Sequence, residues 1–214
     1  MYKLVNNSQV KPYRKYCTEI LEALRDSLNE KYDIKTEFYL VGSGANNLVT
    51  QDGNGPFDLD YNLRLLSMPD KYWKNLKLLK DIVRNTLNSI VGDTLFSDGQ
   101  DSRSVITSNL IFKNDRTKKE FSFDIAIIAK MNTGNLCRLI HNKQIGQFTW
   151  NEIPSTKDLN GKVKKLKQYG CWEEVRDTYV IKKNMYLQRR DYNHSSFVVY
   201  VETINEVYGK YRFN

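Results

Sequence analysis

The sequence predicts an α/β (α+β) protein in which a core of strands and helices, residues 1–150, is followed by a helical lobe, residues 151–214. Apolar residues alternate with polar ones in several stretches of the first part and recur at helical spacing in others. The second part shows helical spacing only and is rich in basic residues. A chain of 214 residues is long enough to bury the core of such a protein.

Apolar spacing in the first sixty residues predicts a helix, a strand, a tight turn and a second, short helix. The first helix is expected over 12–32, with its proline in the first turn. A β-rich run predicts a strand over 35–41, which ends at the glycine-rich turn 42–44. We expect a short helix over 45–49 and a loop over 51–56, because the latter consists of turn-forming residues.

The remainder of the core is predicted to contain one long helix and three strands. Alternating apolar residues predict a strand over 57–66, and helical spacing predicts a helix over 70–91. Two further strands, 104–112 and 121–129, are expected to form a hairpin across the polar connection 113–120.

After residue 151 the pattern becomes helical throughout. Helices are predicted over 155–169, with a Ser or Thr cap, over 172–189 and over 195–208. The boundary between core and lobe is expected near Pro154, and no internal repeat is present.

The charge of the chain favours an anionic partner. Thirty-three Lys and Arg residues against 25 Asp and Glu residues give a formal net charge of +8. Such an excess attracts nucleotides and RNA, although it also contributes to solubility. Many basic residues crowd the C-terminal third, among them Lys157, Lys162, Lys164, Lys165, Lys167, Arg176, Lys182, Lys183, Arg189 and Arg190.

Cysteine and histidine content predicts a cytoplasmic protein without structural zinc. Cys17, Cys137 and Cys171 are far apart and form no C-x-x-C pair, which favours a reducing cytosol over a disulfide framework. With only His141 and His194 besides, a zinc site is not expected. No apolar run reaches the roughly 18 residues of a membrane span, and the N-terminus lacks a signal-peptide core.

Three aspartates in predicted strands indicate a metal-binding site. Residues two apart on a strand point to the same side, so Asp58 and Asp60 stand together. Asp124 lies in a strand whose other face is apolar. If the two strands are neighbours, the three carboxylates can hold two hard divalent cations for phosphoryl transfer, with Mg²⁺ preferred and Mn²⁺ as a substitute.

The Gly42-Ser43 turn is expected to complete this site. Glycine lets backbone N–H groups approach phosphate oxygens, and the helix that follows directs its positive end toward them. An Asp-x-Asp strand or a Gly-Ser turn alone is a weak signal, because each is common for structural reasons. The ordered combination of both with a later strand aspartate is far more specific.

In that order the motifs Gly42-Ser43, Asp58-Leu59-Asp60 and Asp124 resemble the DNA polymerase β-like nucleotidyltransferase superfamily over about residues 35–130. The resemblance implies a mixed, mostly antiparallel sheet with helices on one face and a C-terminal helical lobe that closes the cleft. It implies an ATP-binding or related magnesium-dependent transferase, which moves a nucleotide from a nucleoside triphosphate to a hydroxyl. The implied nucleotide-binding residues are Gly42, Ser43 and Asn46, and the implied catalytic and metal-binding residues are Asp58, Asp60 and Asp124.

Within the superfamily, the residues leading from Ser104 to Asp124 are similar to the branch of oligoadenylate synthases and bacterial cyclic-oligonucleotide synthases. Two features depart from the pattern. Fourteen residues separate Ser43 from Asp58, which indicates a local insertion, and residues 44–47 lack the Arg and Thr of the bacterial signalling enzymes. RNA or a nucleotide is the favoured acceptor, because an antibiotic nucleotidyltransferase would use acidic groups to bind a polycationic drug.

Two other function classes remain open. The chain could be a non-catalytic RNA-binding module of the same fold, or a toxin-antitoxin nucleotidyltransferase that acts on tRNA or a protein. The Arg189 to His194 spacing matches certain helical ribonucleases, but a basic helix end explains it better. Tyr200 and Tyr208 are expected in the helical core rather than as platforms for bases.

Overall fold

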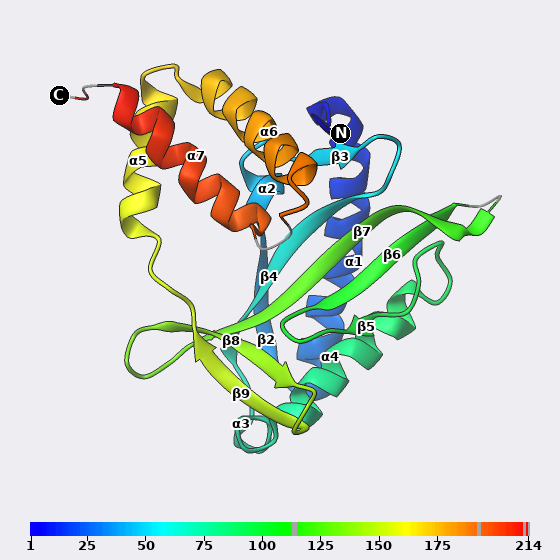
Figure 1. Cartoon of the computed structure of the whole chain (residues 1–214). Helices are drawn as coiled ribbons and strands as arrows, with labels where there is room; N and C mark the ends of the chain where they lie inside the picture. Colours follow the sequence, from blue (N-terminus) through cyan, green and yellow to red (C-terminus); the bar gives the residue numbers. More distant parts are fainter. Residues whose placement is uncertain (113–114, 192–193, 212, 214) are drawn as a thin grey trace.

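The computed structural model describes residues 1–112, 115–191, 194–211 and 213 (Figure 1). In this part of the chain a seven-stranded sheet has the order β2-β4-β7-β6-β5, with β8 beside β7 and β9 beside β8. The strands are β2 Lys35–Val41, β4 Phe57–Ser67, β5 Gln100–Asp101, β6 Ile106–Phe112, β7 Asp115–Lys130, β8 Leu136–Asn142 and β9 Gln147–Glu152. No helix described is long and apolar enough to cross a membrane.

Among the described residues, only one pair of neighbouring strands in this sheet is parallel. β4 runs parallel to β7 and antiparallel to β2, and β7 runs antiparallel to both β6 and β8. Parallel strands need a long crossover, which here contains α3 Asp70–Lys74 and α4 Leu76–Val91. The sheet is therefore mixed and mostly antiparallel, as expected.

One face of the sheet is covered by α4 and by α1 Asn7–Tyr32, which lie behind it in Figure 1. Every second residue of β4, from Phe57 to Leu65, is buried against these helices. The rings of Tyr13, Phe57 and Phe121 meet at centroid distances of 4.8–5.2 Å. The odd-numbered residues of β4 therefore face the core, and its even-numbered residues face the other side of the sheet.

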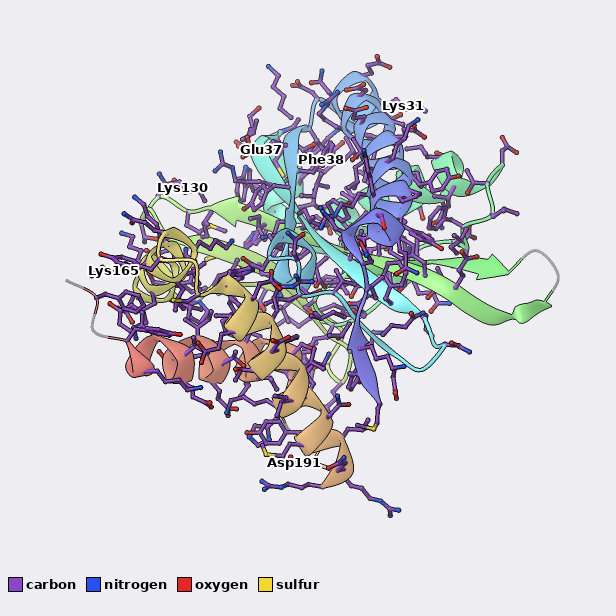
Figure 2. The ribbon with its side chains drawn as sticks, turned by 90° about the horizontal axis from the view of Figure 1, so that it is seen from above. Lys31, Glu37, Phe38, Lys130, Lys165 and Asp191 are labelled. Carbon is purple, nitrogen blue, oxygen red and sulfur yellow. The ribbon has the colours of Figure 1, made fainter. Side chains whose placement is uncertain are left out.

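Three helices follow β9: α5 Lys157–Gln168, α6 Trp172–Gln188 and α7 Ser196–Lys210. They share a small apolar core formed by Leu166, Val175, Ile204 and Val207. In Figure 2, α6, whose end is marked by Asp191, extends to the opposite side of the molecule from the end of α1 marked by Lys31.

The helices after β9 are joined to the N-terminal part of the chain through β1 Tyr2–Leu4, which pairs with β3 Thr50–Asp52. Asn184 on α6 accepts from the backbone N–H of Tyr2 at 2.7 Å and donates to its carbonyl at 2.9 Å. A second apolar cluster contains Leu48, Tyr179 and Val199. These contacts place α6 and α7 beside α2 Gly42–Ala45, the turn at the end of β2.

Helix boundaries differ from the sequence prediction where local capping decides them. The first helix begins at Asn7 because Asn6 and Gln9 form a capping box, so Pro12 lies inside the helix rather than in its first turn. The predicted helix 70–91 is broken at Asn75, whose side chain caps α4 by accepting from the N–H of Leu78. The short helix predicted over 45–49 is wrong apart from Ala45, because the helical turn covers Gly42–Ala45 instead and includes the predicted glycine-rich turn.

The predicted strands are present, but five further strands of the described residues were missed. β2 and the β6–β7 hairpin are confirmed, and β4 ends one residue later than predicted. The predicted loop 51–56 is partly wrong, because its first two residues belong to β3. Of the predicted connection 113–120, residues 113–114 lie outside the described part and 115–120 belong to β7. The sequence did not reveal β1, β3, β5, β8 or β9, and the expected side-chain cap of α5 is absent at Thr156.

Candidate active site

The fold places the three predicted carboxylates on one face of two adjacent strands. Asp58 and Asp60 lie on β4, on the face opposite to the buried residues of that strand. In the parallel register, Asp60 pairs with Asp124 of β7 and Asp58 pairs with Ser122. Because paired residues of neighbouring strands point to the same side, all three carboxylates face away from the α1–α4 layer.

The pKa shifts show that these carboxylates repel one another. Burial, together with the charges of Asp58 and Asp124, raises the pKa of Asp60 to about 6, and the positive charge of Arg138 opposes this shift. Burial and the charge of Asp58 also raise the pKa of Asp124, although a hydrogen bond from Thr107 opposes this shift. Mutual repulsion of this kind requires that the charges lie close together.

The carboxylates do not converge on a single point in their present rotamers. In the described part of the chain, no three His, Cys, Asp or Glu side chains are grouped closely enough to hold a metal ion. The Oδ1 atom of Asp124 is engaged by the hydroxyl of Thr107, which donates to it at 2.5 Å from β6. Thr107 is paired with Asp124 in the β6–β7 register, so the strand order fixes this contact.

The glycine-serine turn lies directly beside the central carboxylate. Val41, the last residue of β2, pairs with Asp60, and Gly42 follows with φ of +61°. A Cβ atom on Gly42 would lie 2.7 Å from Oδ2 of Asp60, and only glycine therefore fits both the backbone angle and the space. The turn and the carboxylates thus form one site.

Asn46 connects this turn to the C-terminal helices. Its side-chain amide donates to the carbonyl of Gly42 at 3.1 Å, and its Oδ1 atom accepts from Lys167 of α5 at 3.3 Å. The indole N–H of Trp172, on α6, donates to the Asn46 carbonyl at 3.2 Å. Ser43 accepts backbone hydrogen bonds from Asn46 and Leu48, so its own position is fixed by the same turn.

Lys183 of α6 is a site residue that the sequence did not single out. Its Nζ atom donates to the Thr50 hydroxyl at 2.8 Å and lies 4.1 Å from the ring centre of Tyr2. Burial lowers the pKa of Lys183, while the nearby charge of Asp58 opposes that shift. The only signal in the sequence is the spacing of four between Tyr179 and Lys183, which puts both on the inner face of α6.

The Arg189 to His194 motif marks the end of α6, and residues 192–193 within it lie outside the described part. Arg189 is the C-cap of the helix, and the His194 Nδ1 atom lies 3.0 Å from Oδ2 of Asp191. The His194 ring stacks on Tyr186 at 3.9 Å. Tyr200 and Tyr208 pack against the core of the C-terminal helices, as predicted.

No family model matches the sequence, and no curated protein does. Solved structures do match the fold. The chain superposes on the Vibrio cholerae DncV cyclic AMP-GMP synthase in complex with the linear intermediate 5′ pppA(3′,5′)pG with a TM-score of 0.69. The sequence identity is 10%, and the match covers 99% of this chain and 69% of that one.

Two further solved structures give the same result. The GTP-bound form of Vibrio cholerae DncV has a TM-score of 0.58 at 13% identity, covering 98% of this chain and 54% of that one. CdnC of E. coli MS115-1 with ATP also has a TM-score of 0.58, at 14% identity, covering 96% of this chain and 62% of that one. The chain thus spans between 54% and 69% of the length of these solved chains.

These matches confirm the fold predicted from the order of the Gly-Ser, Asp-x-Asp and single-Asp motifs. Because the sequence identities are only 10–14%, these matches establish similarity of fold and nothing finer. The chain has the polymerase β-like nucleotidyltransferase fold, in the form shared by the DncV and CdnC proteins.

Proposed function

We propose that the protein is a metal-dependent nucleotidyltransferase that transfers a nucleotide from a nucleoside triphosphate to a hydroxyl group and releases pyrophosphate. The observation that carries this proposal is the position of three carboxylates on one face of β4 and β7, beside the turn that begins at Gly42. That arrangement occurs in a fold whose solved relatives are bound to GTP, ATP or a linear dinucleotide intermediate.

The carboxylates fit a hard divalent cation. Burial is the largest cause of the raised pKa of Asp60, and repulsion by the charges of Asp58 and Asp124 raises it further. A bound cation would neutralise that repulsion. All three side chains offer oxygen ligands, which Mg²⁺ and Mn²⁺ prefer. We propose Asp58, Asp60 and Asp124 as the metal-binding residues, where the ion would neutralise charge on the transferred phosphoryl group.

Two sides of the site are suited to bind phosphates. On one side, Ser43 and the backbone of its turn offer donors to the terminal phosphates of the nucleotide. On the other, Lys183 brings a positive charge from α6 toward Asp58. These groups would orient the triphosphate so that pyrophosphate leaves in line with the attacking hydroxyl.

Asp124 is the residue proposed to act on the attacking hydroxyl. Burial raises its pKa, and Thr107 holds one of its two oxygens. The other oxygen remains available to accept the hydroxyl proton as the new phosphoester bond forms and the bond to pyrophosphate breaks.

The acceptor proposed is a second nucleotide. The DncV structure contains a linear intermediate in which two nucleotides are joined. The match to that structure covers 99% of this chain. The positive charge of the chain and the lysine at the site suit an anionic acceptor. RNA is the alternative acceptor. Residues 151–214 would form the lobe that closes over both substrates.

Incubation of the protein with each nucleoside triphosphate, singly and mixed, with Mg²⁺ or Mn²⁺ tests the proposal. We expect pyrophosphate and a product of joined nucleotides, identified by mass spectrometry. Asp58→Ala and Asp124→Ala should abolish product without unfolding the chain, whereas Asp26→Ala, on exposed α1 surface, should retain activity. Product formation at wild-type rate by either site variant would remove that residue from the mechanism, and tight RNA retention without any transfer would favour the binding module.

A further inference from the structure

A small cavity lies where α1, the segment after α2 and helix α6 meet. Its volume is about 60 Å³. Three valines form its apolar wall, and its polar wall consists of two guanidinium groups and two side-chain amides. The lining residues are Val5, Val10, Val49, Asn7, Asn47, Arg14 and Arg176.

Both arginines of this cavity carry a buried donor without a partner. The Nε atoms of Arg14 and Arg176 are inaccessible to solvent and form no hydrogen bond with the described residues. A buried N–H that has lost water and gained no acceptor is destabilising, so such donors indicate a missing acceptor. Both donors belong to side chains that line this one cavity.

The charge of the cavity is not neutralised locally. Arg14 donates to the carbonyl of Gly44 at 2.6 Å and to Oδ1 of Asn47 at 3.4 Å, and it forms no ion pair with the described residues. Arg176 is held by Glu173 at 2.9 Å, but that carboxylate is 76% exposed and largely screened by water. Two positive charges therefore line the cavity with one weak counter-charge.

We propose that this cavity binds a small tetrahedral oxyanion, either inorganic phosphate or the phosphate group of a small phosphoester. A water molecule occupies about 30 Å³ of the liquid, so the cavity has room for a few waters or one such anion. The two Nε donors would meet its oxygens. Asn47, whose oxygen accepts from Arg14, has its amide N–H groups available as further donors.

The cavity is connected to the proposed active site through its two arginines. Arg14 holds the carbonyl of Gly44, in the same turn as Gly42 and Ser43, and Arg176 lies on the same helix as Lys183. An anion bridging the two arginines would fix the turn and α6 relative to each other. This regulatory consequence rests on the proposed function, whereas anion binding itself does not.

Thermal unfolding in metal-free and nucleotide-free buffer at constant ionic strength tests binding. Inorganic phosphate should raise Tm saturably, by roughly 5–10 °C at hundredfold excess over Kd. Arg176→Gln should abolish the rise and Arg14→Lys should weaken it, while Arg25→Gln, an arginine on the exposed surface of α1, should leave it unchanged. The rise should persist in Ser43→Ala and Lys183→Met, which separates this cavity from the active site.

Three outcomes would overturn the proposal. They are no phosphate-dependent rise in Tm, an equal rise in Arg176→Gln, or loss of the rise in Ser43→Ala. Parallel titrations with adenosine monophosphate and with a short RNA identify the source of the phosphate. A shift with inorganic phosphate or the monophosphate supports a small-anion site, and a shift with RNA alone contradicts it. None of these results depends on whether the protein transfers nucleotides.

Discussion

Gly42 and Asp60 adjoin so closely that a Cβ atom on the glycine would lie 2.7 Å from Oδ2 of the aspartate. Gly42→Ala should therefore displace the central carboxylate and strain the backbone, whose φ is +61°. We expect loss of nucleotide transfer by at least about 100-fold, together with a loss of about 1–2 kcal/mol in the free energy of unfolding. Activity assays and denaturant titration measure the two effects.

Gly53→Ala is the matched control for this substitution. Gly53 has φ of +57°, but no atom lies within 4 Å of the position that its Cβ would take. It should show a similar cost in stability with nearly full activity. If both variants lose activity equally, the contact between residue 42 and Asp60 is not the cause of the loss.

The raised pKa of Asp60 predicts a pH-dependent stability in the absence of metal. Because the folded pKa, about 6, lies above the ordinary aspartate pKa of 3.8, the folded chain binds the proton more tightly than the unfolded chain does. Stability from this group is therefore full below pH 4 and declines as the pH rises through 6. Asp60→Asn should gain up to about 3 kcal/mol over wild type at pH 8 and nothing at pH 4.

Melting curves of both proteins in EDTA between pH 4 and pH 8 check this expectation. A gain that is the same at every pH would show that the carboxylate of Asp60 is not destabilised by its neighbours. Addition of Mg²⁺ at pH 8 should stabilise wild type and leave Asp60→Asn with a smaller response.

Thr107 is expected to position Asp124 by donating to its Oδ1 atom. Thr107→Val removes the hydroxyl but keeps the shape, so the pKa of Asp124 should rise further and activity should fall by about 10-fold at neutral pH. The pH profile should shift upward as well, which a purely structural defect would not cause. Thr107→Ser should restore both rate and profile; failure of this rescue would argue against the hydrogen bond.

Lys183 is expected to contribute to nucleotide affinity. Lys183→Met should lower kcat/KM for the nucleoside triphosphate by about 10- to 100-fold, because a charge-assisted contact to phosphate is lost. Lys182→Met provides the control on the same helix, since the Nζ atom of Lys182 pairs instead with Glu206 at 2.9 Å. Equal losses in the two variants would mean that general charge, rather than this position, is responsible.

Asp101 lies at the centre of a buried ion network outside the active site. Loss of this network should determine how strongly a substitution of Asp101 lowers stability. The carboxylate of Asp101 lies 2.5 Å from Nζ of Lys80, which is almost fully buried, and 2.6 Å from Nδ1 of His141. Asp101→Asn would leave the lysine without a counter-charge and should cost about 3–5 kcal/mol in denaturant titrations. Asp81→Asn, which breaks partly exposed pairs on α4, should cost less than about 1 kcal/mol.

The pH dependence of this network has the opposite sign to that of Asp60. Burial favours a raised pKa for Asp101, but hydrogen bonds from Lys80 and His141 outweigh it and the pKa is lowered. Its contribution should therefore be present above pH 4 and be lost as the pH falls below that value. Equal acid sensitivity of wild type and Asp101→Asn would contradict this.

Strand periodicity made the site partly predictable from the sequence. The alternation around Asp58 and Asp60 gave the correct face of β4, because burial of every second residue leaves a pattern within a few positions. The pairing of Asp60 with Asp124 required the order of strands in the sheet. That order depends on contacts between distant segments, and only the resemblance in motif order indicated it.

The missed elements lack a local signal of this kind. β8 contains polar and charged residues, including Arg138 and His141, within its seven positions, so its apolar alternation is weak. Lys183 is one of many lysines in the C-terminal third, and only the packing of α6 against β1 distinguishes it from Lys182. Tertiary contacts, rather than propensity, determine both.

Asp60 and Asp124 are paired across parallel strands, although a long crossover connects β4, which ends at Ser67, to β7, which begins at Asp115. During synthesis, β4 can pair with β2 early, but the two acids can meet only after β7 has left the ribosome. Closing so long a loop is slow in entropic terms. A chain that terminates before β7 therefore lacks Asp124, and its set of three carboxylates is incomplete.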